Sequence, residues 1–364
     1  MTLTATIRAR LGGDFQLDVT FSVVPGITML FGASGSGKTS VLRCLAGFRR
    51  PDAGRVAIGE RVLFDAGRRI NLQPRQRNVG YVFQNLALFP HMTVEQNIHY
   101  GLASLAPDAR RVKTQTIAAS FRIAHLLDRR PGEISGGERQ RTALARSLVT
   151  DPSLLLLDEP LSALDHVSQS RIIEDLRAWN AARGIPILYV THAHREVFAL
   201  AEHVIVLENG TILAEGTSEE VLETPVQEPL AHLAGFENFL DATVTSVSPD
   251  AGSMRCRLAG CDVELEVPRA RAEPGARVRI AVRAGDILLA NQEPQGFSAR
   301  NVLAGVIVSM QREGATVILF VQAGATFEVH LTPGASESLR LAAGQRVWLV
   351  MKTHSCRVVS VRSR

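Results

Sequence analysis

The chain has 364 residues, of which 46% are hydrophobic and 21% are charged, a composition typical of folded proteins. Its formal net charge of +4 comes from Lys and Arg residues scattered along the chain, which argues against a dedicated nucleic-acid surface. A chain of this length is long for one hydrophobic core, so we expect a larger and a smaller domain.

The four cysteines include no C-x-x-C pair, which disfavours both disulfides and a structural zinc site. The longest apolar runs, such as Leu154 to Leu157, are far shorter than the ~20 residues of a membrane-spanning helix. The opening MTLTATIRAR lacks the apolar core of an export signal. We therefore expect a cytosolic protein that reaches a membrane only through a partner.

From Thr2 to about residue 235, apolar runs alternate with helical stretches such as KTSVLRCLAGF and GERQRTALARSLV. The runs are ITMLFG, VGYVF, LLLLDEP, ILYVTH and VIVLENG. Strands that are apolar throughout are expected where helices cover both faces of a sheet. Residues 1–235 are therefore predicted to form an α/β domain with a largely parallel sheet.

The run GASGSGKT follows one predicted strand and precedes a predicted helix, which is the context of a phosphate-binding loop. Backbone N–H groups of such a loop surround phosphate oxygens, and the helix N-terminus adds partial positive charge. Lys38 is predicted to reach the β- and γ-phosphates of ATP, and Thr39 to bind Mg²⁺. The predicted ATP-binding residues here are Gly32, Ala33, Ser34, Gly35, Ser36, Gly37, Lys38, Thr39 and Ser40.

Two adjacent carboxylates, Asp158 and Glu159, end the apolar run LLLLDEP. An unpaired carboxylate at the end of a buried strand is costly, because it resists leaving water. A magnesium ion removes this cost: Asp158 is predicted to hold the metal, and Glu159 to polarise the attacking water. The first domain is thus predicted to be an α/β P-loop NTPase.

A further set of motifs indicates which class of P-loop NTPase this domain resembles. They are YVFQN with Gln84, ISGGERQR from Ile134, SALD ending at Asp165, and YVTH with His192. Together with GASGSGKT and LLLLDEP, in this order and spacing, they resemble the nucleotide-binding subunit of an ABC transporter. The resemblance covers residues 1 to about 235.

The resemblance implies a head-to-tail homodimer that encloses two ATP molecules. The signature residues Ser135, Gly136, Gly137 and Glu138 of one subunit would face the γ-phosphate bound by the other. Gln84 would sense the metal and the water, Asp165 would line the dimer seam, and His192 would contact the γ-phosphate. Ile134 and Glu138 replace the usual Leu and Gln of the signature, and we expect activity to survive both changes.

Two further implications concern surfaces around the nucleotide. The family places an aromatic residue before the phosphate loop to stack on adenine, and Phe15 is the best candidate, although a strand-face phenylalanine is nearly as good an interpretation. The segment after Gln84, NLALFPHMTVEQNIHYGL, matches the part of the family that receives the membrane subunit; its apolar residues fit a core equally well.

After Phe236 the pattern changes to short alternating runs separated by Gly and Pro, which is typical of a small β-barrel. Two parts of this tail are similar to each other: ENFLDATVTSV resembles RNVLAGVIVSM, and PGARVRIAVRAGDILL resembles AGQRVWLVMKTHSCRV. Residues 236–364 are therefore predicted to be an all-β tandem of OB-like units, the second spanning about 296–362.

The stretch SARNVL in the second unit resembles the molybdate-binding Mop/TOBE-like domain at the C-terminus of molybdate importer ATPases. A tetrahedral dianion needs several preorganised donors. Those predicted here are Ser298, the N–H of Ala299, Arg300, Asn301 and Lys352. The alternative, that Arg300 and Lys352 are simply solvated, stays open.

The repeat yields one more hypothesis about the tail. Gly235 and Glu237 stand in the first unit where Ser298 and Arg300 stand in the second. Because a carboxylate is the wrong charge beside an anion, the oxyanion donors are predicted to lie mainly in the second unit.

The whole sequence thus predicts the ATPase of a molybdate importer, with ATP and Mg²⁺ as cofactors. It would lie at the cytoplasmic face of the inner membrane as a peripheral homodimer, with permease subunits and, indirectly, a periplasmic or extracellular solute-binding protein as partners. Import of tungstate, sulfate, iron or polyamine is the alternative within this class. A soluble ABC ATPase acting on nucleic acid or ribosomes is disfavoured, because the tail offers Trp348, Phe297 and few other aromatics for stacking. A storage or sensing module with a secondary ATPase is also disfavoured, because the catalytic motifs are intact.

Overall fold

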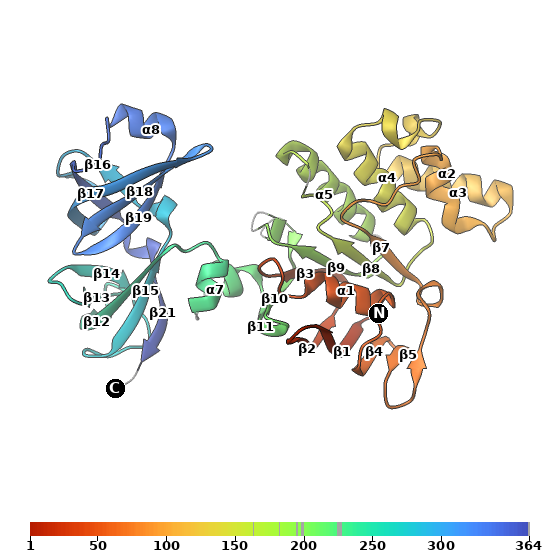
Figure 1. The fold of residues 1–364 in the computed structure, drawn as a ribbon, viewed down its shortest axis with the longest axis horizontal. Helices are drawn as coiled ribbons and strands as arrows, with labels where there is room; N and C mark the ends of the chain where they lie inside the picture. Colours follow the sequence, from red (N-terminus) through yellow and green to blue (C-terminus); the bar gives the residue numbers. More distant parts are fainter. Residues whose placement is uncertain (163, 182, 194–195, 198–199, 224–227, 363–364) are drawn as a thin grey trace. The chain divides into compact units, whose positions relative to one another are not determined.

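The computed structural model describes residues 1–364 except 163, 182, 194–195, 198–199, 224–227 and 363–364. The described residues form two compact units, Met1–Ser218 and Glu219–Arg364, which are treated separately below (Figure 1). No helix in the described part of the chain combines the length and apolar character needed to cross a membrane.

Unit 1 contains one eleven-stranded sheet, in the order β6-β5-β4-β1-β2-β11-β10-β3-β9-β8-β7. Its strands are β1 (Leu3–Gly12), β2 (Phe15–Val23), β3 (Gly26–Phe31), β4 (Ala53–Ile58), β5 (Arg61–Asp65), β6 (Ile70–Asn71), β7 (Val79–Val82), β8 (Leu154–Asp158), β9 (Pro186–Thr191), β10 (His203–Glu208) and β11 (Thr211–Gly216). The α-helices given for its described residues are α1 (Lys38–Ala46), α2 (Val94–His99), α3 (Pro107–Ser120), α4 (Gly136–Leu148) and α5 (His166–Ala181).

The centre of this sheet is parallel, because β10, β3, β9, β8 and β7 pair in parallel in that order. These are the runs that the sequence predicts to be covered on both faces, and every residue of β8 and β9 is buried. Strands β1, β4, β5 and β6 extend the sheet with antiparallel pairing on the other side. The predicted α/β domain with a largely parallel core is confirmed.

The C-terminus of α1 is closed by a buried arginine. Arg77 has no exposed surface, and it donates to the carbonyls of Cys44 and Leu45, both at 2.8 Å. It also donates to Leu72 O at 2.9 Å and Asn71 Oδ1 at 3.0 Å. The last carbonyls of a helix have no partner within the helix and carry partial negative charge, so this guanidinium supplies both hydrogen bonds and a favourable charge.

In its described residues, unit 2 contains two five-stranded sheets and two short α-helices, α7 (Glu228–Leu233) and α8 (Pro333–Ser338). The strands are β12 (Asn238–Ser248), β13 (Ser253–Leu258), β14 (Glu264–Pro268), β15 (Arg277–Val282), β16 (Leu288–Ala290), β17 (Asn301–Glu313), β18 (Thr316–Ala323), β19 (Ala325–Leu331), β20 (Arg346–Met351) and β21 (Cys356–Arg362).

The two sequence repeats of unit 2 exchange their last strands. The first sheet has the order β14-β13-β12-β15-β21 and the second β16-β20-β17-β18-β19. Strand β21, from the second repeat, therefore completes the sheet of the first, and β16 completes the sheet of the second. Buried side chains of both sheets form one hydrophobic core. The all-β tandem is confirmed, but a second unit spanning 296–362 is not a separate barrel.

The division between the compact units lies at Ser218, before the sequence-based boundary at residue 235. The reason is that α7 packs on unit 2. Arg279 of β15 donates to Glu228 of α7 at 3.1 Å, and the ring of His232 lies 3.9 Å from that of Phe239.

Candidate functional site

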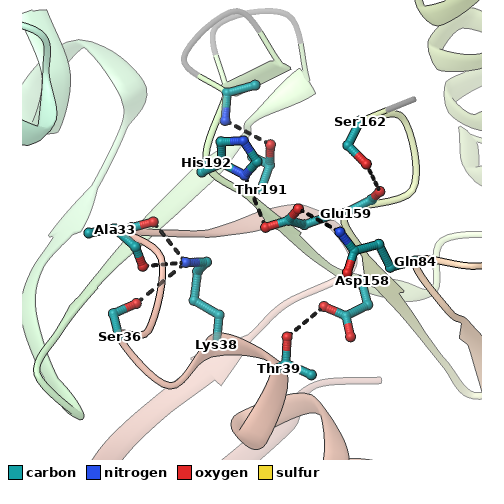
Figure 2. Close-up of polar contacts among 12 residues, drawn as sticks. Ala33, Ser36, Lys38, Thr39, Gln84, Asp158, Glu159, Ser162, Thr191 and His192 are labelled. Atoms are coloured by element: carbon teal, nitrogen blue, oxygen red, sulfur yellow. Dashed lines mark hydrogen bonds and ion pairs between the residues drawn. The ribbon is translucent and has the colours of Figure 1, made fainter. Parts of the chain in front are cut away.

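The predicted chemical groups of unit 1 meet at one edge of its sheet. Strands β3, β7, β8 and β9 are parallel neighbours, so their carboxyl ends lie side by side. The phosphate-loop sequence follows β3, Gln84 follows β7, Glu159 follows β8 and His192 follows β9. Figure 2 shows these side chains converging at this edge.

The phosphate loop holds Lys38 through its own backbone carbonyls. Its Nζ donates to Gly32 O at 2.8 Å and to Ala33 O at 2.7 Å, and the residue is only 5% exposed (Figure 2). Burial lowers the pKa of this ammonium, and the charges of Glu159 and Asp158 partly oppose that shift. Gly37 has φ of +106°, a backbone conformation that favours glycine. The loop therefore presents a partly desolvated cation toward the cavity.

Asp158 ends β8 with two hydroxyl partners. Thr39 Oγ1 donates to its Oδ1 at 3.0 Å, and Tyr81 Oη donates to its Oδ2 at 3.0 Å. The carboxylate is only 6% exposed, and both of these partners are neutral. Hydroxyl and carboxylate oxygens are the ligands that Mg²⁺ prefers, so this pair fits the predicted metal site.

Glu159 lies between Gln84 and His192. Its Oε1 is 3.0 Å from His192 Nδ1, and Gln84 Nε2 donates to its Oε2 at 3.3 Å (Figure 2). Its φ is +45°, an uncommon conformation for a residue other than glycine, and its backbone N–H donates to Val190 O at 3.0 Å. The carboxylate is thus oriented from both sides, as a general base has to be.

A cavity of about 610 Å³ joins the phosphate loop to Gln84, Glu159 and His192, whereas Asp158 does not line it. Of the predicted residues, it is lined by Phe15, Ser34, Gly35, Gly37, Lys38, Thr39, Ser40, Gln84, Glu159 and His192. The ring of Phe15 lies against Gly37, where an added Cβ would be 3.4 Å from it. The structure therefore brings the aromatic candidate to the same cavity as the phosphate loop.

The signature residues are not among those that line this cavity. Ser135 caps the N-terminus of α4, and Glu138 accepts hydrogen bonds from both the N–H and the hydroxyl of Ser135 at 2.7 Å. These two bonds lower the pKa of Glu138. Asp165 accepts from the N–H of Ser168 at 3.0 Å and from its hydroxyl at 2.7 Å. A contact of these residues with a second subunit stays a prediction.

A partly buried arginine that the motifs do not reveal connects α4 to the loop after Gln84. Arg146 donates to Leu86 O at 2.8 Å and to Ala87 O at 2.7 Å, and it lies 5.4 Å from the centre of the Phe89 ring. Leu86 and Ala87 have φ of +61° and +45°, which is an unfavourable conformation for both residue types. The guanidinium therefore stabilises the loop shape that positions Gln84.

We expect Arg146→Met to lower the ATPase kcat about tenfold and to leave the KM for ATP nearly unchanged, as is typical when a residue that orients a catalytic side chain is lost. Steady-state phosphate release measures both constants. Arg111→Met, on the exposed surface of α3, is the matched control. An equal loss in both variants, or a changed KM with kcat unaffected, would contradict a positioning role.

The five predicted oxyanion residues of unit 2 are only partly brought together. Ser298, Ala299 and Lys352 line a cavity of about 540 Å³, with Ser355 and the carboxylate of Asp286. Arg300 is exposed and does not line it.

Asn301 requires a correction. It is only 2% exposed, its Nδ2 donates to Glu266 O at 2.9 Å, and its Oδ1 accepts from the N–H of Glu266. Its amide is therefore used to join β17 to β14 and is not a donor for an oxyanion.

Comparisons with known proteins agree with this geometry. The model of the family "ABC transporter" matches residues 17–162, and that of the "TOBE domain" matches residues 298–358. A solved nucleotide-free ATP-binding cassette from an ABC transporter is 26% identical, with a TM-score of 0.52, and covers 60% of this chain and 93% of its own. These matches identify unit 1 as the ATP-binding cassette of an ABC transporter.

Full-length relatives narrow the family. The molybdenum import ATP-binding protein ModC of Rhizobium meliloti is 39% identical over 359 residues, 97% of this chain and 99% of the relative. The protein of the same name from Paramagnetospirillum magneticum is 38% identical over 346 residues, 94% of each chain. This chain is therefore a member of the family of molybdenum import ATP-binding proteins.

Proposed function

We propose that this chain hydrolyses ATP to drive molybdate import through a membrane ABC transporter. The observation that carries the proposal is the Glu159 carboxylate held between Gln84 and His192, beside the phosphate loop. The names of the full-length relatives support molybdate as the solute.

ATP would lie in the cavity of unit 1, with its phosphates against the loop from Gly32 to Thr39 and near Lys38. Mg²⁺ would be held by Thr39 and Asp158, with Gln84 close by. The ion supplies charge for the developing phosphate transition state. Glu159 would take the proton of the attacking water, and His192 would keep that carboxylate oriented and contact the γ-phosphate.

Two copies would form the active dimer, each contributing Ser135, Gly136, Gly137 and Glu138 to the nucleotide of its partner, with Asp165 at the seam. The dimer would act as a peripheral complex at the cytoplasmic face of the inner membrane. It would bind integral permease subunits, and a periplasmic or extracellular solute-binding protein would deliver the solute to them.

Phe15 is proposed to stack on adenine, since its ring borders the same cavity as the phosphate loop. We expect Phe15→Ala to raise the KM for ATP about tenfold, because base–aromatic stacking contributes about 1–3 kcal/mol. Phe15→Trp should keep the KM within about twofold, as it retains a stacking surface. Steady-state ATPase assays with both variants test this. An unchanged KM for Phe15→Ala would favour a strand-face phenylalanine without a nucleotide contact.

The tail is proposed to bind the transported oxyanion inside the cell and so regulate the motor. Ser298, Ala299 and Lys352 border one cavity, and the exposed Arg300 precedes the buried Asn301. Lys352→Ala should weaken molybdate binding to the full-length chain, measured by calorimetry with sulfate and tungstate as comparison anions.

The proposed transport is tested in cells whose own copy of the gene is deleted. The intact chain should restore uptake of radiolabelled molybdate, and Glu159→Gln, expressed to the same level, should not. Restored uptake of sulfate, iron or polyamine without uptake of molybdate would show that the chain serves an importer of that other solute. Growth defects confined to translation would favour the soluble ribosome-acting class instead.

A further inference from the structure

The two repeats of unit 2 place corresponding residues in corresponding positions. Asn238 pairs with Val282 across β12 and β15, and Asn301 pairs with Met351 across β17 and β20. The long strands β12 and β17 each have an irregularity at the same relative place, after Val244 and after Ile307. Position by position, the two halves can therefore be compared directly.

The asparagines confirm this correspondence. Asn238 binds the backbone N–H and carbonyl of Glu328 in the other repeat, at 2.7 and 2.9 Å, as Asn301 binds those of Glu266. Each repeat is thus joined to its neighbour by the same two-bond contact.

The residues just before the two asparagines differ in charge. The first half has Glu237 where the second half has Arg300. The Oε2 atom of Glu237 accepts a hydrogen bond of 2.7 Å from the N–H of Ala284. Ala284 corresponds to Thr353, because each begins the short turn that follows β15 or β20.

Both halves have a basic residue directly after the strand β15 or β20. Arg283 stands in the first half where Lys352 stands in the second, and it lies 4.5 Å over the ring of Phe236. Phe236 is 4% exposed and occupies the position of Ala299. In the first half, the Glu237 carboxylate thus accepts from the N–H of Ala284, and the Phe236 ring takes the place of the Ala299 methyl group. Together they fill the position that corresponds to the proposed oxyanion site of the second half.

We propose that Glu237 is a built-in anion, which occupies in the first half the position that an oxyanion takes in the second. The chain would then bind one oxyanion and not two. This inference rests on the proposed oxyanion site of the second half, and it adds the reason why the repeat has only one such site.

The test measures molybdate stoichiometry on the full-length chain by equilibrium dialysis, with sulfate as the comparison anion. The intact chain should bind one molybdate. The double variant Phe236→Ala/Glu237→Arg, which gives the first half the sequence GARN, should bind two. Glu273→Arg changes the net charge by the same amount as Glu237→Arg, at an exposed position, and should still bind one.

The reverse exchange keeps the proposal testable if the double variant fails to fold. Arg300→Glu introduces a carboxylate at the position that corresponds to Glu237 and should abolish binding, with the circular dichroism and melting temperature of the intact chain preserved. Two sites in the intact chain, or one in a folded double variant, would overturn the built-in anion. No binding by the intact chain would instead refute the oxyanion site on which the inference rests.

Discussion

Glu159→Gln should reduce the ATPase kcat by about 10²–10⁴-fold, the usual contribution of a general base. The substitution keeps the shape of the side chain between Gln84 and His192 but removes the proton acceptor. ATP binding should be retained, since Lys38 and the phosphate loop are unchanged. Phosphate release at saturating ATP measures the rate, and a fluorescent ATP analogue measures the affinity.

Glu60→Gln is the matched control for this variant, because Glu60 is an exposed residue in the turn between β4 and β5. Its rate should equal that of the unmodified chain. A Glu159→Gln protein with more than about a tenth of the normal rate would show that another group accepts the proton.

Arg77→Met should lower the free energy of unfolding of unit 1 by about 3–5 kcal/mol. The substitution leaves the carbonyls of Cys44, Leu45 and Leu72 buried without their charged donor, and each such loss costs about 1–3 kcal/mol. Arg77→Lys should lose less, because it keeps the charge at the end of α1 but cannot reach all four acceptors.

The fluorescence of Trp179 reports this unfolding, once Trp348, the other of the two tryptophans, is changed to Phe. Urea titration of the full chain then follows unit 1 alone. Arg75→Met, exposed and two residues away, should stay within about 0.5 kcal/mol of the parent. Equal midpoints for the two arginine variants would mean that the hydrogen bonds of Arg77 contribute nothing measurable.

The groups of the nucleotide site could be predicted from the sequence because each one, or in the case of Lys38 the loop that carries it, follows an apolar run. Once the runs are read as parallel strands, Lys38, Asp158, Glu159 and His192 have to meet at one edge. Arg77 and Arg146 could not be found this way. Apart from Asn71 Oδ1, the hydrogen-bond partners described above for these two arginines are backbone carbonyls, and a carbonyl leaves no mark in the sequence.

Asn301 shows how a local motif can mislead. Within SARN it looks like one more hydrogen-bond donor for an anion. Yet of the four residues in SARN and GFEN, only the asparagine is the same in both repeats. The first repeat keeps the asparagine although it has no basic residue beside it, and this indicates a structural role. The hydrogen bonds of Asn238 and Asn301 across the repeats confirm that role.

The order in which a ribosome makes the chain gives the strand exchange a further consequence. β15 has left the ribosome long before Cys356–Arg362, the strand that covers its outer edge, is synthesised. Until then β15 presents unpaired backbone groups, which are an opportunity for pairing with another nascent chain. The first half of the tail can therefore complete its sheet only after β21 has left the ribosome, and a chain that stops just short of β21 would expose the edge of β15 permanently.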